Sequence, residues 1–235
     1  MKTIIGIVLM LLMGLGLQAQ APAQKPLRLG LGLMGTSYVG DLNSNGGAWN
    51  RFSPGANLSL QFASEHLLSP QLNAGFGKFV AQDRDLKPVD GIQPITFVQT
   101  SFFYVDVRLK ARFLRQAPVH PYVSAGVGLL GYTPKDADGN NLIDNLASRK
   151  DGETFGSMTV GLPLSAGFEV RIHPILHLGL EYTYRITGSD YLDNIGQIGL
   201  RNGKDKLQSL LLTLYVTFDP EAAKSGSSLR GRDRD

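Results

Sequence analysis

Acidic and basic side chains alternate with apolar ones in several parts of this 235-residue chain. In the segment DVRLK, an aspartate, an arginine and a lysine stand two positions apart, so an extended strand would place all three on one side. Carboxylates beside cations could form ion pairs or serve as an acid–base pair in catalysis. The set that we single out is Arg28, Asp106, Arg108, Lys110, Glu169, Arg171, Glu181 and Arg185.

Other residue types that carry chemistry are sparse. The chain has no cysteine, which excludes a thiol nucleophile and a cysteine metal site. The segment DADGNNLID (136–144) resembles a calcium loop in its acidic spacing, but it lacks the full pattern and the final glutamate. Glycine-rich runs alternate with leucines instead of opening a helix, so they do not indicate a nucleotide site. We predict no metal, no cofactor and no small-molecule substrate.

The elements that would position the charged set are β-strands. In LHLGLEYTYRIT, apolar residues take every second position and polar residues the positions between them, which is the period of a strand with two unlike faces. The same alternation recurs at about eight places, which are residues 27–34, 57–62, 72–77, 102–113, 123–129, 159–172, 176–186 and 209–218. Pro163 lies inside one of these runs and predicts a bulge or a late strand start, because proline cannot donate to a ladder.

The ends of the chain differ from the middle. A lysine at position 2, an apolar run of about fourteen residues and small residues at Ala19 and Ala21 are typical of a cleavable signal peptide. We therefore predict a signal peptide at 1–19, a linker at 20–26, one barrel domain at 27–218 and a disordered tail at 219–235. The tail, which ends in RGRDRD, would be either an inert solvated end or a tether to an acidic periplasmic protein.

The connections between the predicted strands are alternately long and short. Long polar segments follow the first, third, fifth and seventh strands, and short turns follow the others. Together with export, this pattern predicts an all-β fold: an eight-stranded antiparallel up-and-down transmembrane β-barrel in the outer membrane of a Gram-negative cell. The long loops would be extracellular, and the short turns and both mature termini would be periplasmic.

A soluble barrel with an apolar, ligand-holding interior would reverse the two faces. Three features favour the membrane arrangement. The polar side is rich in Gly, Ser, Thr and Asn instead of Lys and Glu, and an apolar side appears on every strand. Aromatic residues near strand ends, among them Tyr132, Tyr182 and Phe218, suit interfacial girdles. Lys78 falls on the apolar side, and we expect it to reach the outer rim.

The interior of an eight-stranded barrel is just wide enough to be filled by side chains. We therefore expect the eight charged residues singled out above to pack inside as a structural ion-pair network, because buried charges persist only when they are paired. A regulated path for ions is the alternative interpretation of the same residues.

Several short segments carry a resemblance to a known family. They are TSYVGDLN (36–43), HPYVSAGVGLLGYTPK (120–135) and LPLSAGFEVRIHPILHLGLEYTYR (162–185), which leads into DYLDNI (190–195). With these motifs the chain resembles the outer-membrane β-barrel family that includes the small barrel subunit of the type IX secretion apparatus. The resemblance implies a barrel that couples the outer membrane to periplasmic proteins of a secretion machine.

Three functions follow as hypotheses. The first is a non-enzymatic accessory or anchoring barrel in a secretion or envelope complex, and the second is a generic OmpA/OmpX-type barrel for envelope integrity or surface contact. A small channel or a lipid-modifying enzyme is the third. The histidines, at 66, 120, 173 and 177, would all lie at the periplasmic end, away from an outer-leaflet substrate. Expected partners are outer-membrane lipid and lipopolysaccharide, with periplasmic envelope or secretion proteins; nucleic acid is excluded because no basic block exists.

Overall fold

The computed structural model describes residues 26–42, 52–62, 67–82, 95–114, 117–143, 156–196 and 203–218. The predicted signal peptide, the linker up to position 25 and the tail at 219–235 lie outside the described residues. The strands are β1 (Leu27–Val39), β2 (Ser53–Phe62), β3 (Leu68–Gln82), β4 (Phe97–Arg112), β5 (Val119–Lys135), β6 (Met158–His173), β7 (Leu176–Thr187) and β8 (Lys206–Phe218). In the part of the chain that the structure describes, no helix is long and apolar enough to span a membrane.

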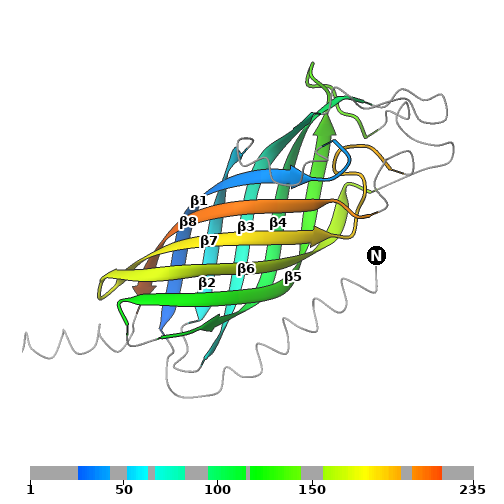
Figure 1. Cartoon of the computed structure of the whole chain (residues 1–235). Helices are drawn as coiled ribbons and strands as arrows, with labels where there is room; N and C mark the ends of the chain where they lie inside the picture. The colour runs from blue at the N-terminus through cyan, green and yellow to red at the C-terminus, as the bar shows by residue number, and fades with distance from the viewer. Residues whose placement is uncertain are drawn as a thin grey trace, which may run out of the picture. The chain divides into compact units, whose positions relative to one another are not determined.

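The eight strands form one closed antiparallel barrel in sequence order (Figure 1). Each strand pairs with the next, and β1 closes the sheet by pairing with β8 from Leu27↔Phe218 to Val39↔Lys206. Connections 40–52, 83–96, 136–157 and 188–205 join strands at one end of the barrel, which we call the loop end. Connections 63–67, 113–118 and 174–175 join them at the other, the turn end. The predicted fold class and the alternation of long and short connections are confirmed.

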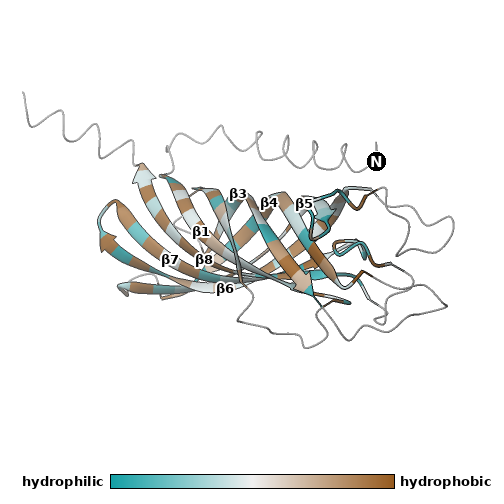
Figure 2. Ribbon diagram, turned by 90° about the horizontal axis from the view of Figure 1, so that it is seen from above, coloured by the Kyte–Doolittle hydropathy of each residue, from teal (hydrophilic) through white to brown (hydrophobic). Residues whose placement is uncertain are grey.

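The apolar side of each strand points outwards. Leu31, Leu33 and Phe76 are 69%, 73% and 65% exposed, whereas the inward neighbours of the two leucines are buried. Figure 2 shows the resulting alternation of brown and teal along the strands. So much exposed leucine would be a liability in water, and it matches a belt that faces lipid. The reversed arrangement of a soluble ligand-binding barrel does not occur.

The outward face becomes polar near the loop end. Lys78 points outwards there and is aligned with Ser101 of β4, which in turn is aligned with Thr133 of β5. The apolar belt ends one outward position earlier, at Phe76 and Phe103. Lys78 therefore lies at the rim of the belt, where its amine can reach water.

Three local expectations need correction. Tyr132, expected in an outer girdle, points inwards and is 2% exposed. It occupies one of the alternate positions of β5 whose side chains point into the barrel, which we call the inward parity of a strand. The third strand was predicted as 72–77 but runs over Leu68–Gln82. No bulge lies at Pro163, because β6 keeps its register with β7 there. On the other side, the aligned pairs of β6 with β5 stop at Ala125↔Leu164 and resume at Gly128↔Gly161 in the same register. The missing N–H of proline thus interrupts a ladder without shifting it.

Candidate functional site

The interior holds the densest cluster of ionisable groups among the described residues. Asp106, Arg108 and Lys110 enter it from β4, Glu169 from β6, and two further charged residues from β7. Each has the inward parity of its strand, opposite the apolar residues on the outside. Alternation in the sequence is therefore what brings these side chains into one space.

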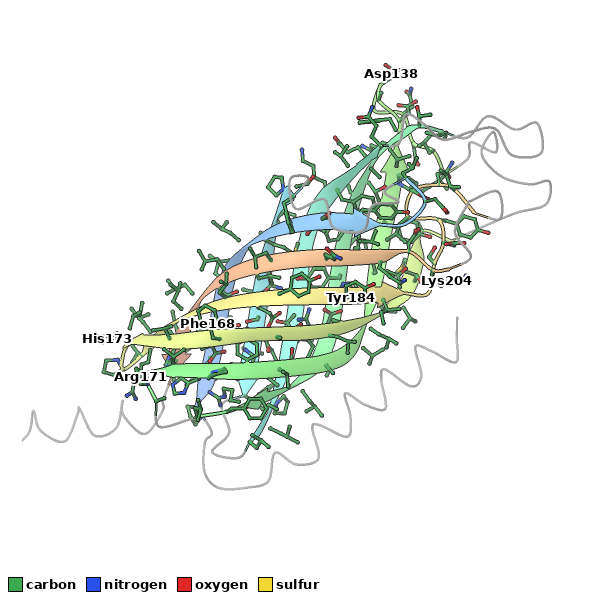
Figure 3. The ribbon with its side chains drawn as sticks, in the orientation of Figure 1. Asp138, Phe168, Arg171, His173, Tyr184 and Lys204 are labelled. Atoms are coloured by element: carbon green, nitrogen blue, oxygen red, sulfur yellow. The ribbon has the colours of Figure 1, made fainter. Side chains whose placement is uncertain are left out.

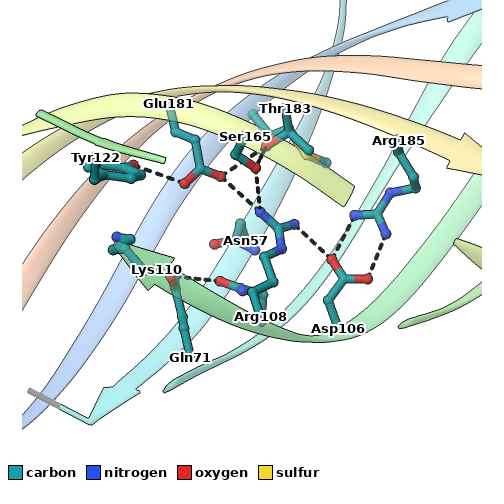
Figure 4. Close-up of polar contacts among 12 residues, drawn as sticks. Asn57, Gln71, Asp106, Arg108, Lys110, Tyr122, Ser165, Glu181, Thr183 and Arg185 are labelled. Atoms are coloured by element: carbon teal, nitrogen blue, oxygen red, sulfur yellow. Dashed lines mark hydrogen bonds and ion pairs between the residues drawn. The ribbon is translucent and has the colours of Figure 1, made fainter. Parts of the chain in front are cut away.

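Asp106, Arg108, Glu181 and Arg185 form a group that we call the central clamp (Figure 4). Arg185 donates to both oxygens of Asp106, Nη1 to Oδ1 at 2.6 Å and Nη2 to Oδ2 at 2.8 Å. Arg108 bridges the two acids, with Nη2 2.7 Å from Asp106 Oδ2 and Nη1 2.9 Å from Glu181 Oε1. The clamp thus joins β4 to β7 across the barrel by paired, hydrogen-bonded charges, which is the condition for burying them.

A second ionic group lies nearer the turn end. Lys110 Nζ donates to Glu169 Oε1 at 2.7 Å, and Arg28 Nη1 from β1 reaches Glu169 Oε2 at 3.3 Å. The same ammonium lies 3.9 Å from the centre of the Tyr122 ring, and the Tyr122 hydroxyl donates to Glu181 Oε2 at 2.9 Å. Tyr122 therefore links this group to the central clamp.

Arg171 does not belong to the network, although the sequence predicted it there. Its side chain is exposed, at the turn end of β6 beside His173 (Figure 3). Arg171 has the inward parity, but it lies beyond Glu169, where the wall no longer encloses a side chain. The β6–β7 register also shifts between Arg171 and His173, which marks this rim as irregular. The other seven predicted residues are brought together.

Several uncharged residues complete the interior, where the alternation predicts them, although they were not singled out as part of the charged network. Ser165 Oγ accepts from Arg108 Nη1 at 3.0 Å, and Thr183 Oγ1 donates to Glu181 Oε1 at 2.9 Å. The guanidinium carbon of Arg185 lies 4.1 Å from the centre of the Tyr104 ring. All three uncharged residues have the inward parity of their strands, so the alternation alone could have identified them.

The loop end of the interior contains an apolar cluster, although the alternation predicts a polar inner face. Its buried cluster is Met34, Tyr38, Leu42, Phe79, Ala81, Val98, Phe102, Tyr104, Leu130, Tyr132, Leu142, Leu192, Ile195, Leu207 and Leu211. Residues 188–196, which we call the mouth segment, supply Leu192 and Ile195 to this cluster. They follow β7 and cover the interior from the loop end.

Polar contacts hold the mouth segment in place. Thr100 Oγ1 donates to the carbonyl oxygen of Leu192 at 2.6 Å, and the hydroxyls of Tyr132 and Ser189 are 2.6 Å apart. Tyr38 Oη lies 2.7 Å from Asp193 Oδ2 and 2.5 Å from Asp205 Oδ1. Burial raises the pKa of Asp193 to about 7, and burial together with the neighbouring Asp193 charge raises the pKa of Asp205.

The remaining residues with potential chemistry are scattered. His120 and His173 lie at the turn end, His177 contacts Arg28 there at 3.4 Å, and His66 is outside the described residues. Asp136 accepts hydrogen bonds from the Asn140 side chain and backbone, which lower its pKa. Among the residues that the structure describes, no group of three His, Cys, Asp or Glu could hold a metal ion.

Comparison with known proteins agrees with this architecture. The family described as "Outer membrane protein beta-barrel domain" matches residues 7–218. Neisserial surface protein A, from Neisseria, superposes with a TM-score of 0.53 at 14% identity, covering 82% of this chain and 97% of its own. Ail, the attachment invasion locus protein of Yersinia pestis, gives 0.47 at 14% identity, with coverages of 83% and 99%. A major outer membrane protein of Thermus thermophilus gives 0.46 at 13%, with coverages of 82% and 99%. A search of the curated proteins finds no match.

Proposed function

Since the chain belongs to the outer membrane protein β-barrel domain family, we propose that it is a sealed, non-enzymatic barrel which serves envelope integrity or surface contact. The family implies location in the outer membrane, with the apolar belt in lipid. The long connections at the loop end would then meet the cell exterior, and the turn end would face the periplasm. In this function the barrel wall contacts lipid and the loops contact the cell exterior, while the interior stabilises the shape of the barrel.

The filled interior carries this proposal. Arg108 is 2% exposed, and Asp106 and Lys110 are completely buried, so the largest inward side chains occupy the centre. Above them the mouth segment packs its apolar residues against the inner wall. Ion conduction needs a path on which an ion exchanges water for weak, successive ligands. A clamp whose cations are already neutralised by buried carboxylates offers no such path.

The proposed absence of catalysis rests on where the candidate bases lie. Acting on an outer-leaflet lipid would require a base with its nucleophile or carboxylate partner near the loop end. His120, His173 and His177 lie at the turn end, at the opposite side of the barrel. Asp193 and Asp205, two of the acids near the loop end, are buried in the barrel mouth and have no access to a lipid.

The accessory role in a secretion complex has weaker support. The segment DYLDNI, one carrier of the resemblance to the type IX barrel subunit, forms part of the mouth segment. Its Leu192, Asp193 and Ile195 are buried in the barrel, at 0%, 0% and 1% exposure. The motif thus has an internal packing role, and these three side chains are not available to a partner protein. We therefore favour the generic envelope function.

Conductance across planar bilayers tests the proposal. We expect the reconstituted protein to show little steady current, whereas Arg108→Ala, which removes the largest completely enclosed side chain, should produce frequent openings. The matched control is Arg171→Ala, since Arg171 is exposed outside the network and should leave the current unchanged. A large stable current in the unmodified protein would refute the sealed barrel.

A further inference from the structure

Three acidic groups, one phenol and two carboxyls, meet in the mouth of the barrel. Tyr38 from β1 lies 2.7 Å from the Asp193 carboxyl and 2.5 Å from the Asp205 carboxyl, and all three residues are at most 3% exposed. The other oxygens of the two acids are also engaged. Asp193 Oδ1 accepts from the backbone N–H of Ile195 at 2.9 Å, and Asp205 Oδ2 accepts from that of Leu192 at 2.8 Å.

The Tyr38 hydroxyl has too few hydrogens to serve both carboxyls. A tyrosine hydroxyl has one hydrogen and can donate it to one carboxylate. The second carboxyl lies at hydrogen-bond distance from the same oxygen, so that contact needs a proton on the carboxyl itself. With two carboxylates, the second would instead place an uncompensated charge against an oxygen lone pair in a buried space.

We propose that Asp193, Tyr38 and Asp205 share one extra proton and that this proton is a latch which keeps the mouth segment docked in the barrel. Loss of the proton leaves two buried carboxylates competing for one hydroxyl hydrogen. The docked state then becomes less favourable, and the mouth segment moves away from the inner wall. The inference concerns a switch in the barrel mouth and does not depend on the proposed sealing of the interior.

The surroundings of the latch favour the protonated form. Asp41 follows β1 and adds negative charge near Asp193, and Asp190 does the same near Asp205. Phe79 of β3 stacks on the Tyr38 ring, with the two ring centres 4.8 Å apart. In the described part of the chain, no lysine or arginine forms an ion pair with either latch carboxyl.

The direction of the pH dependence follows from these pKa shifts. A carboxyl released into water has a pKa of roughly 4, whereas burial raises the pKa of docked Asp193 to about 7. The docked state therefore binds more protons than the released state at every pH between these values. Docking is strongest in acid, and it weakens as the pH rises through this window to above about 7.

Cysteine labelling can measure the latch, because the natural chain has no cysteine. The probe is a single-cysteine variant Leu192→Cys in lipid vesicles, treated with a water-soluble maleimide between pH 5.5 and 9. Asp138→Cys, at an exposed position near the loop end, is the reference (Figure 3). Dividing the two rates removes most of the intrinsic pH dependence of the thiol. We expect the ratio to be low in acid, to rise by up to about tenfold per pH unit as the pH approaches the pKa of docked Asp193, and to level off above it.

Asparagine variants provide the decisive comparison. In Asp205→Asn, the side-chain oxygen can still accept from Leu192, and its NH₂ can donate permanently to Tyr38. The latch would then be closed at every pH, and the labelling ratio should stay low up to pH 9. Asp193→Asn should keep the latch closed in the same way. It is used in place of Asp205→Asn if that variant does not fold, as judged by heat-modifiable gel migration. A flat profile in the parent protein, or an unchanged rise in the folded asparagine variant, would overturn the proposal.

Discussion

Asp106 shows why a charged residue can lie at the centre of this barrel. Its two oxygens accept three N–H groups, two from Arg185 and one from Arg108, at 2.6 to 2.8 Å. The desolvation of a carboxylate is compensated when its charge and its lone pairs are satisfied together. The same is true of the cations, since each faces a carboxylate or an aromatic ring. The network is therefore sensitive to loss of one member.

We predict that Asp106→Ala lowers the free energy of unfolding by about 3–5 kcal/mol, because it leaves two buried guanidiniums without their shared partner. Urea titration in lipid vesicles measures this change, and the loss should hardly depend on salt, since buried pairs are poorly screened. Asp138→Ala, which alters an exposed acid, is the matched control and should change stability by less than about 0.5 kcal/mol. Equal effects of the two substitutions would contradict the clamp.

The inward faces of the strands carry both large and small side chains, which pack against each other inside the barrel. Gly128 of β5 lies directly opposite Asp106 of β4. A Cβ at this position would collide with the Asp106 carboxylate and with the carbonyl oxygen of Val105. Glycine at this position is therefore required by the close approach of β5 to the Asp106 carboxylate.

Gly128→Ala should therefore destabilise the barrel by about 1–3 kcal/mol through overpacking against the clamp. Gly161→Ala is the control on the neighbouring strand, where the nearest atom to the new Cβ is the flexible Cδ of Arg185 at 3.3 Å. We expect that substitution to cost less than the first in the same urea titration. The reverse order would mean that Gly128 is not packed against Asp106.

Depth along a strand decides the cost of an outward charge. Leu31 is 69% exposed in the middle of β1, aligned with Leu58 and Leu214 in the apolar belt. Leu31→Arg should lower the free energy of unfolding in lipid by about 2–4 kcal/mol. Ser101→Arg also faces outwards, but it lies beside Lys78 at the rim and should cost at most about 1 kcal/mol. Similar costs at both positions would invalidate the assignment of the belt.

The barrel as a unit is closed by its first and last strands. The β1–β8 ladder extends from Leu27↔Phe218 over the length of β1, so all eight strands are complete by position 218. We expect deletion of residues 221–235 to leave heat-modifiable gel migration and insertion into lipid unchanged. Deletion of residues 212–235 removes the outward Leu212 and Leu214 with their ladder pairs, and it should abolish folding. Loss of insertion in the shorter deletion would show that the tail is part of the folding unit.

Much of this architecture could be predicted because it depends on period-two alternation. Leu178 and Leu180 lie outside, and Glu181 and Arg185 inside, for the same local reason that successive side chains of a strand point to opposite faces. Closure into eight strands then places the inward charges of β4, β6 and β7 in one narrow space. Whether a charged residue joins the ionic network thus depends mostly on which face of its strand it occupies. The prediction for Arg171 was wrong because the alternation does not tell how far along the barrel a residue lies.

The mouth of the barrel could not be derived in this way. Tyr38 meets Asp193 and Asp205 across separations of 155 and 167 residues, and the mouth segment, which supplies Asp193, has no periodicity. Its position depends on apolar packing of Leu192 and Ile195 against residues from several strands, and such packing exists only after the barrel has closed. Local alternation therefore specifies the wall and which way each side chain points. The non-local burial of one loop decides what fills the loop end and which acids must share a proton.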